Sequence, residues 1–252
     1  MRQDSASFQE LINEASLCVG EAGAEVQKYI VLPALMDIMG PIQGKEILEV
    51  YCGAGFLSRR FASMGATVTG VDSSVTLIDI ANEINSREAV KINYINSESN
   101  DLSAIEDSAY DEIICNMGMM MTRDLGGTIA ELARLIKMGG RFIFSILHPC
   151  FHTPDSCWAG DEDGRFCYRT IDNYFTDTWW TSELASNIRS GRNKVKHRPL
   201  FRYINALGAR GFTVRRVIEP RPSPEILAIK PQLEVFNRIP AAIIIEAIFP
   251  YL

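Results

Sequence analysis

The chain has 252 residues, of which 47% are hydrophobic and 22% are charged, and its net charge is −6. This length suits one large α/β domain or a domain with an insertion, and the composition is that of a globular protein with a full core. The longest apolar runs are too short to span a bilayer and the first residues lack the apolar stretch of a signal peptide, so we expect a cytoplasmic protein with no membrane partner.

The acidic balance argues against a nucleic-acid partner, because phosphate backbones are bound by lysines and arginines. One basic cluster, residues 189–198, keeps an RNA-binding surface open, although a solvated loop explains it as well. The six cysteines contain no CxxC pair, which favours reduced thiols. Five residues that can bind metals crowd together in a spacing that matches no zinc module, so no metal site is predicted: His148, Cys150, His152, Cys157 and Cys167.

Residues 1–43 show helical periodicity and predict an N-terminal helical cover. Pro33 is expected to start a new helix or to kink the existing one, since proline lacks the backbone N–H. Gly40-Pro41 should end this part of the chain. The early apolar residues that recur at helical spacing are Phe8, Leu11, Ile12 and Ala15.

From residue 44 onward, strand-like and helix-like segments alternate, which predicts a mainly parallel sheet with helices on both faces. We assign residues 44–147 to a cofactor-binding core of this kind. The predicted strands are 46–51, 67–71, 91–95, 110–116 and 141–147, and the predicted helices are 56–64, 74–86 and 123–137.

The alternation stops over residues 148–197, which hold all three tryptophans and several prolines and glycines. A long aromatic segment directly after a strand is typical of a functional cover, so we predict an insertion that acts as a lid. Regular structure resumes in residues 198–252, with a helix at 198–210 and strands at 212–218 and 241–248 joined through a proline-rich stretch.

The segment around residues 47–56 is the most informative part of the chain. An apolar run is followed by Tyr51-Cys52-Gly53-Ala54-Gly55, the type of turn that receives a nucleotide-like cofactor at the first strand–helix junction. Gly53 and Gly55 let the backbone pass close to a ligand. Tyr51 stands where a leading glycine is expected.

An acid, Asp72, ends the second predicted strand about twenty residues after this turn, where it can accept hydrogen bonds from ribose hydroxyls. The alternative is that Asp72 caps the next helix, for which Ser73 is equally suited. Position 58 is serine rather than the third glycine of a dinucleotide-binding turn, which argues against an NAD-dependent oxidoreductase.

At these residues the sequence resembles the class I S-adenosylmethionine-dependent methyltransferases, and it is similar to a bacterial subgroup that acts on small molecules. The resemblance implies a Rossmann-like, seven-stranded, mainly parallel sheet with an antiparallel last strand. It also implies S-adenosyl-L-methionine as cofactor and S-adenosyl-L-homocysteine as product. The matching segments are 49–55, 70–74, 94–102, 110–116 and 133–142, with 146–151, 197–200 and 219–222 for the subgroup.

The resemblance also implies roles for single residues. Glu49 would hold the ammonium group of the cofactor, Asp72 and Ser73 would lie at the ribose, and Asn116 would approach the methionyl part. Glu98 and Ser99 stand where the family has its adenine-binding Asp-Ala pair. Tyr51 would stand beside the methionine end, and Gly53 and Gly55 would let the backbone approach the cofactor. Tyr51, Glu98 and Met138 are departures from the family pattern. Read without the family, Glu49 is a surface acid at a strand end and Asn116 is a turn residue.

The expected reaction is transfer of a methyl group to nitrogen or oxygen of a small organic acceptor by in-line displacement. An aromatic wall beside the acceptor is expected from four residues of the lid, Tyr168, Tyr174, Trp179 and Trp180. His148, directly after a strand, and His197, before a helix, are the candidate catalytic bases, each with a structural alternative. His197 also suits an anion-facing site, whereas His152 is expected to be a solvated loop residue. An RNA methyltransferase and a non-methylating protein that binds the same cofactor remain alternatives, and a homodimer stays open.

Overall fold

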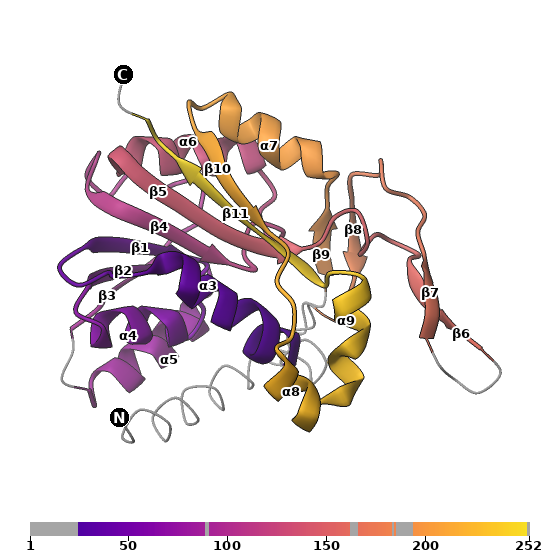
Figure 1. The fold of residues 1–252 in the computed structure, drawn as a ribbon. Helices are drawn as coiled ribbons and strands as arrows, with labels where there is room; N and C mark the ends of the chain where they lie inside the picture. Colours follow the sequence, from indigo (N-terminus) through magenta and orange to yellow (C-terminus); the bar gives the residue numbers. More distant parts are fainter. Residues whose placement is uncertain (1–24, 89–90, 162–165, 183, 185–193, 251–252) are drawn as a thin grey trace.

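The computed structural model describes residues 25–88, 91–161, 166–182, 184 and 194–250 (Figure 1). A seven-stranded sheet in the order β10-β11-β5-β4-β1-β2-β3 forms its centre. Strand β11 pairs antiparallel with both of its neighbours, and the other pairs are parallel. The predicted Rossmann-like sheet with an antiparallel last strand is therefore confirmed. The strands are β1 (Glu46–Val50), β2 (Thr67–Asp72), β3 (Asn93–Asn96), β4 (Tyr110–Asn116), β5 (Ile136–Leu147), β10 (Thr213–Ile218) and β11 (Ala242–Ile248).

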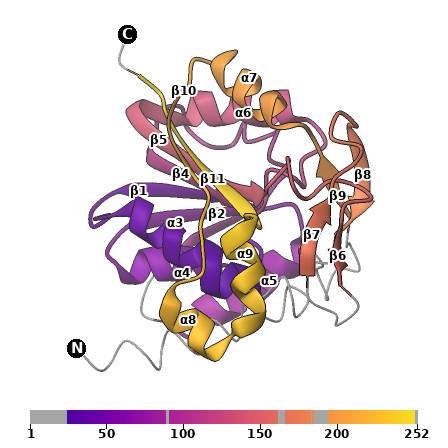
Figure 2. The same cartoon turned by 45° about the vertical axis from the view of Figure 1, so that its right-hand side comes forward.

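Helices cover both faces of the sheet, as the alternation predicted. One face carries α3 (Leu32–Met39), α4 (Phe56–Ser63) and α5 (Val75–Asn85), and the other carries α6 (Leu125–Leu135) and α7 (Leu200–Gly208) (Figures 1 and 2). Consecutive strand residues point to opposite faces. Ile47 accordingly belongs to the core cluster that contains Phe61 of α4, and Leu48 belongs to the cluster that contains Leu132 of α6.

The helix before the sheet widens just ahead of Pro33. Residues Gln27–Val31 form the π-helix η1, and the N–H of Leu32 donates to the carbonyl oxygen of Gln27. Proline lacks an N–H and its ring collides with the carbonyl four residues earlier, so the wider turn relieves that clash. The predicted change of helix at Pro33 is confirmed. The periodic set Phe8 to Ala15 lies outside the described residues.

Strand β5 begins at Ile136, earlier than the predicted residue 141. Ile136 pairs with Tyr110 of β4, and the N–H of Gly139 donates to the carbonyl oxygen of Phe249 over 2.7 Å. Gly139 itself has a φ of 76°, which glycine adopts without strain. Pairing with β4 and with Phe249 therefore extends β5 into residues whose local sequence predicts the end of a helix.

Two parts of the chain hold regular structure that the sequence did not predict. The insertion forms two hairpins, one from β6 (Cys157–Gly160) and β7 (Phe166–Thr170), the other from β8 (Thr178–Thr181) and β9 (Lys194–His197). Short helices separate β10 from β11, namely α8 (Pro224–Ile229), the 3-10 helix η3 (Pro231–Glu234) and α9 (Val235–Arg238). Leu233 and Phe236 from these helices join the core cluster of α3.

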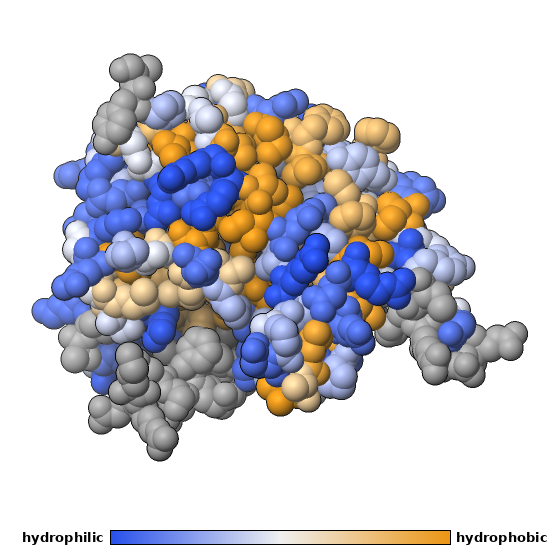
Figure 3. Space-filling model, in the orientation of Figure 1, coloured by the Kyte–Doolittle hydropathy of each residue, from blue (hydrophilic) through white to orange (hydrophobic). Residues whose placement is uncertain are grey.

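Strand β10 forms one edge of the sheet and carries basic residues. Arg215 and Arg216 reach the buried Glu246 of β11, while Val217 is 51% exposed. Figure 3 shows apolar side chains across the middle of this face, interrupted by strongly hydrophilic ones. Charged side chains on an edge strand hinder pairing with another chain. Among the described residues, no helix is long and apolar enough to cross a membrane.

Candidate active site

The turn after β1 keeps the backbone of a glycine-rich turn although a tyrosine replaces its first glycine. Tyr51, Gly53 and Gly55 all have left-handed φ angles, of 62°, 55° and 77°. The N–H of Cys52 donates to the carbonyl oxygen of Val71 over 3.0 Å, which ties the turn to the end of β2. A left-handed tyrosine costs about 1–3 kcal/mol, and such strain persists only where surrounding contacts hold it.

The two glycines of this turn have different neighbours. A Cβ added to Gly53 would meet nothing within 4 Å, so this side of the turn leaves open space for a ligand. A Cβ on Gly55 would lie 2.1 Å from the hydroxyl oxygen of Tyr94, which donates to the carbonyl of Gly55 over 3.3 Å. The space beside Gly53 is thus open, whereas the space beside Gly55 is filled by Tyr94 of β3.

The Tyr51 side chain joins a row of hydroxyl groups. Its hydroxyl oxygen lies 2.8 Å from Ser99 Oγ, which lies 2.9 Å from Thr128 Oγ1 in α6. Thr128 Oγ1 in turn lies 2.9 Å from Thr122 Oγ1. Burial raises the pKa of the Tyr51 phenol, so the hydroxyl stays protonated and can donate. This row connects the turn after β1, the loop after β3 and the loop after β4.

Asp72 bridges the ends of β1 and β2. Its Oδ2 accepts the N–H of Gly53 and its Oδ1 accepts the N–H of Ser74, both over 2.9 Å. Each carboxylate oxygen can accept more than one hydrogen bond. Ser74, rather than Asp72 or the exposed Ser73, caps α5 by accepting the N–H of Leu77, so the capping alternative for Asp72 and Ser73 is wrong.

Glu49 is buried rather than exposed at the strand end. It is 3% exposed, and the hydroxyl of Ser58 donates to its Oε2. Burial raises the pKa of Glu49 to about 8, with the Ser58 hydrogen bond opposing the rise, so the carboxyl is protonated at neutral pH. Ser58 thus gives Glu49 a hydrogen-bond donor that a glycine at position 58 would lack.

The remaining predicted cofactor residues lie at the carboxyl ends of β3 and β4. Glu98 is exposed and Ser99 is buried, side by side in the loop after β3. Asn116 Nδ2 donates to Gln27 Oε1 over 2.9 Å, and its Oδ1 accepts the hydroxyl of Ser145 over 2.7 Å. Asn116 therefore joins η1, β4 and β5 through its side chain, which is more than a local turn contact.

Both ring nitrogens of His148 are engaged. Nε2 lies 2.9 Å from Glu219 Oε1, and Nδ1 accepts the N–H of Cys150 over 3.2 Å. Since Nδ1 is an acceptor, the proton resides on Nε2 and points to Glu219. Burial lowers the pKa of His148, with Glu219 opposing that effect.

His197 presents a different arrangement. Its Nε2 lies 2.9 Å from the carbonyl oxygen of Tyr174, which can only accept, so Nε2 carries the proton. Within the described part of the chain, Nδ1 has no hydrogen-bond partner and keeps its lone pair. Burial lowers the pKa of His197 and favours the neutral ring. His197 lines a recess at the end of β5, together with Met120, Ile146, Trp180 and Tyr203.

The prediction that His152 is a solvated loop residue is wrong. Its side chain is 4% exposed, and Arg169 of β7 donates to its Nδ1 over 3.1 Å. Burial, assisted by Arg169, lowers the pKa of His152 to about 3. His152 therefore stays neutral and anchors the β6–β7 hairpin to the end of β5. The described residues contain no cluster of three metal-binding side chains.

The four aromatic residues considered for a wall are spread over the insertion. Trp180 lines the recess, whereas Tyr168 is 59% exposed and Trp179 is 38% exposed. Tyr174 accepts the N–H of Leu200 through its hydroxyl over 3.2 Å and so positions the start of α7.

One residue of the recess escaped the sequence analysis. Arg198 was assigned to an exposed basic cluster, yet its side chain is 4% exposed. Its Nη2 donates to the carbonyl oxygen of Thr122 over 2.6 Å. The available signal was that Arg198 directly precedes Pro199 at the start of the helix predicted at 198–210. The cluster residues 189–193 lie outside the described chain.

S-adenosylmethionine fits the residues at this edge of the sheet. Gly53 leaves space beside the turn, Asp72 keeps acceptor capacity for hydroxyl groups, and Glu98 lies open at the end of β3. A carboxylate beside open space at the first crossover is the arrangement that a ribosyl cofactor requires.

Comparisons with known proteins agree with this geometry. A family profile described as a methyltransferase domain matches residues 47–140. The chain is 37% identical over 112 residues to the ubiquinone biosynthesis O-methyltransferase of Coxiella burnetii, covering 44% of this chain and 47% of that protein. It is 31% identical over 113 residues to the protein of the same name from Thiobacillus denitrificans, covering 45% and 49%. The chain thus matches about half the length of these curated relatives.

Solved structures match over more of the chain. A candidate S-adenosylmethionine-dependent methyltransferase from Listeria monocytogenes superposes with a TM-score of 0.71 at 28% identity, covering 86% of this chain and 95% of that one. A methyltransferase from Mesorhizobium loti gives a TM-score of 0.73 at 24% identity, covering 86% and 96%, and supports the fold alone. The glycine-type turn, the strand order and these matches show that residues 47–140 form a class I S-adenosylmethionine-dependent methyltransferase domain.

Proposed function

We propose that this protein transfers the methyl group of S-adenosyl-L-methionine to nitrogen or oxygen of a small organic acceptor. The observation that carries the proposal is the turn after β1, which holds a left-handed Tyr51 and leaves Gly53 open while Asp72 bridges it to β2. The bound cofactor supplies an electrophilic methyl group on a sulfonium. The chain supplies orientation and exclusion of water, which are the main contributions to an in-line displacement.

For the cofactor, we propose that Asp72 and Ser73 lie at the ribose and that Glu98 and Ser99 bracket the adenine. Glu49, Tyr51, Gly53, Gly55 and Asn116 would surround the methionyl end. The buried, protonated Glu49 would have to ionise to hold an ammonium group, and the arriving positive charge favours that ionisation.

For the acceptor, we propose the carboxyl end of β5, where the edge of the sheet meets the insertion. Of the two histidine candidates, His197 is better arranged to act as a base, since Nδ1 has a lone pair without a partner among the described residues and Nε2 is held by the carbonyl of Tyr174. His148 would first have to release Cys150 or Glu219. His148 therefore suits a positioning role.

The names of the curated relatives favour oxygen as the atom to test first, since both act in O-methylation. We further propose a cytoplasmic protein whose partner is a small molecule, and a homodimer is one assembly to be tested. Phenols with and without acidic groups are suitable first acceptors.

The test is calorimetry with S-adenosylmethionine and S-adenosylhomocysteine, followed by incubation of the protein with deuterated cofactor in a metabolite extract and mass spectrometry. We expect both ligands to bind and a small molecule to acquire the label. Binding without any labelled product would favour the non-methylating alternative. Label in RNA would favour the RNA methyltransferase, and no binding of either ligand would overturn the proposal.

A further inference from the structure

Gln27 contacts the sheet at the point where its strand order reverses. Strands β2 and β3 follow β1 on one side, whereas β4 and β5 lie on the other, and Glu49 of β1 pairs with Ile114 of β4. In open α/β sheets, ligands bind outside the carboxyl ends of the strands at such a point. Strand β4 ends there at Asn116, whose Nδ2 donates to Gln27 Oε1 of η1 over 2.9 Å.

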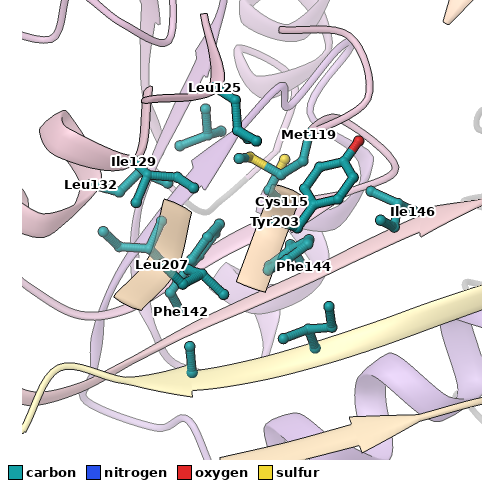
Figure 4. Close-up of a cluster of buried hydrophobic side chains, with 14 of the residues drawn as sticks. Cys115, Met119, Leu125, Ile129, Leu132, Phe142, Phe144, Ile146, Tyr203 and Leu207 are labelled. Carbon is teal, nitrogen blue, oxygen red and sulfur yellow. The ribbon is translucent and has the colours of Figure 1, made fainter. Parts of the chain in front are cut away.

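The two amide groups lie on the face of the sheet that carries η1. Cys115 is fully buried in the apolar cluster on the other face, and Figure 4 shows it together with Met119 and Phe144. Consecutive strand residues point to opposite faces, so Asn116 points away from this cluster and toward η1. Asn116 and Gln27 are both only partly buried, which leaves their amides within reach of a ligand.

Hydrogen bonds fix the orientation of both amides. The N–H of Met117 donates to Ser145 Oγ over 2.9 Å, and the Ser145 hydroxyl donates to Asn116 Oδ1 over 2.7 Å. A reversed Asn116 amide would leave the hydroxyl proton of the fully buried Ser145 without an acceptor among the described residues, which is costly. Asn116 Nδ2 therefore faces Gln27, and Gln27 has to present its oxygen.

This orientation leaves Gln27 Nε2 as an unused donor. Nε2 has no hydrogen-bond partner among the described residues, and it is not one of the fully buried polar atoms of that part of the chain. An amide nitrogen carries two N–H donors and no acceptor. A ligand group that binds Gln27 Nε2 must therefore be an acceptor.

The helix that carries Gln27 is anchored on its other sides. Val26 and Ile30 are each 1% exposed, in the core cluster that contains Phe236 of α9. Glu25 forms an ion pair with Lys230 Nζ at 2.5 Å. A donor that is held in place before a ligand arrives loses less conformational freedom on binding.

The chemistry of the cofactor identifies the matching acceptor. The methionyl part of S-adenosylmethionine has three polar groups, of which the ammonium donates and the sulfonium neither donates nor accepts. Its carboxylate accepts through both oxygens, and an N–H that donates to a charged oxygen forms a stronger hydrogen bond than one between neutral groups. Glu49 at the end of β1 suits the ammonium, which leaves the carboxylate for an amide donor.

We propose that Gln27 Nε2 binds the carboxylate of the methionyl part of S-adenosylmethionine, so that the protein discriminates against cofactor analogues that lack this group. This inference rests on the proposed function, since it takes the carboxyl ends of β1 and β4 as the cofactor site. It adds to that site a residue of the helix before the sheet, to which the sequence analysis gave no role.

Calorimetric titration of S-adenosylmethionine and of decarboxylated S-adenosylmethionine into the full chain tests the assignment. The decisive variant is Gln27→Glu, because a glutamate oxygen still accepts from Asn116 while the donor to the ligand is lost. We expect Gln27→Glu to weaken binding of S-adenosylmethionine by about 10–100-fold and not to weaken binding of the decarboxylated form. Gln43→Glu places the same charge on an exposed side chain before β1, at the opposite edge of the sheet, and should change neither affinity.

Three results would overturn the inference: equal affinity of wild type for the two ligands, unchanged binding of S-adenosylmethionine in Gln27→Glu, or an equal loss of both ligands in that variant. If thermal unfolding shows that Gln27→Glu does not fold, Gln27→Ala is titrated with the same two ligands and the same outcomes decide. Binding of S-adenosylmethionine that does not depend on Gln27 would overturn this inference alone. No binding to wild type would overturn the proposed function together with it.

Discussion

The hydroxyl oxygen of Tyr51 lies 2.8 Å from that of Ser99, so the tyrosine that replaces a glycine ties the turn after β1 to the loop after β3. The row of hydroxyls continues to Thr122, whose carbonyl oxygen accepts a hydrogen bond from Arg198. A connected set of polar contacts thus runs from the proposed cofactor site to the recess. The Tyr51 side chain thus has a structural hydrogen-bond partner of its own in Ser99.

Gly118 accommodates Tyr51. A Cβ on Gly118 would lie 2.5 Å from the Cβ of Tyr51 and 2.7 Å from Cys115 Sγ. We expect Gly118→Ala to lower the free energy of unfolding by about 1–3 kcal/mol through overpacking. In a Tyr51→Gly background the same change should cost less, because the closest clash is removed and only the Cys115 contact remains.

The measurement for this pair is a double-mutant cycle by urea unfolding. Gly208→Ala is the matched control, since a Cβ there would meet nothing within 4 Å. An equal cost of Gly118→Ala in both backgrounds would show that the two residues are not coupled.

Asp72→Ala should weaken binding of S-adenosylhomocysteine by about 1–3 kcal/mol, because the ribose acceptor and the anchor of the Gly53 N–H are lost together. Asp72→Asn, which keeps one acceptor oxygen, should lose less. Calorimetry measures both, with the exposed Asp79→Ala as control. An unchanged dissociation constant in Asp72→Ala would exclude the ribose role.

Glu49 should make stability depend on pH between its unfolded and folded pKa values. The folded pKa is about 8 and the ordinary value is 4.5, so in this interval the folded state binds a proton that the unfolded state has released. Its contribution is fully present below pH 4.5 and is lost as the pH rises to 8, with a slope of up to about 1.4 kcal/mol per pH unit.

Glu49→Gln should remove this slope. The difference in unfolding free energy between wild type and variant, measured from pH 5 to 8, isolates Glu49, because the histidines with lowered pKa values affect both proteins equally. Parallel curves for the two proteins would mean that Glu49 is ionised in the folded state.

Glu246 is fully buried in β11, with Arg141 Nη1 at 3.0 Å and Arg216 Nε at 2.9 Å. Burial alone would raise its pKa, but these two arginines hold it below the usual value. We expect Glu246→Gln to cost about 1–3 kcal/mol, because it weakens two charge-assisted hydrogen bonds while Arg141 keeps Glu112 as a partner. Glu83→Gln, which breaks an exposed pair with Arg87 on α5, should cost no more than about 0.5 kcal/mol in the same chemical denaturation.

His197→Gln should lower methyl transfer by about 10²–10⁴-fold at neutral pH while S-adenosylhomocysteine affinity holds. Burial lowers the pKa of His197, so the wild-type rate should fall only when the pH drops below the ordinary value of 6.5, and this acid limb should vanish in the variant. The assay is the pH–rate profile of wild type, His197→Gln and His148→Gln. Loss of the limb in His148→Gln alone would assign the base to His148.

Much of the core was predictable because it is encoded in local patterns. Strand β4 was predicted at its observed bounds, and the glycine turn, Asp72 and the antiparallel β11 occupy the expected places. Hydrophobic period and turn chemistry act over a few residues, so they can be read along the chain. The early start of β5 and the helices α8 and α9 could not be read in this way, since long-range pairing and packing produce them.

Local sequence patterns were enough to predict the sheet, the turn after β1 and the residues at the strand ends. The burial of the polar groups became clear only from the fold: Glu49 is protonated against Ser58, His152 is held by Arg169, and Arg198 is buried with one nitrogen that has no partner among the described residues. Charge state and hydrogen-bonding capacity depend on solvent exposure and on partners from distant segments, which local patterns do not encode. The same residues on an exposed loop would have been ordinary acids and bases.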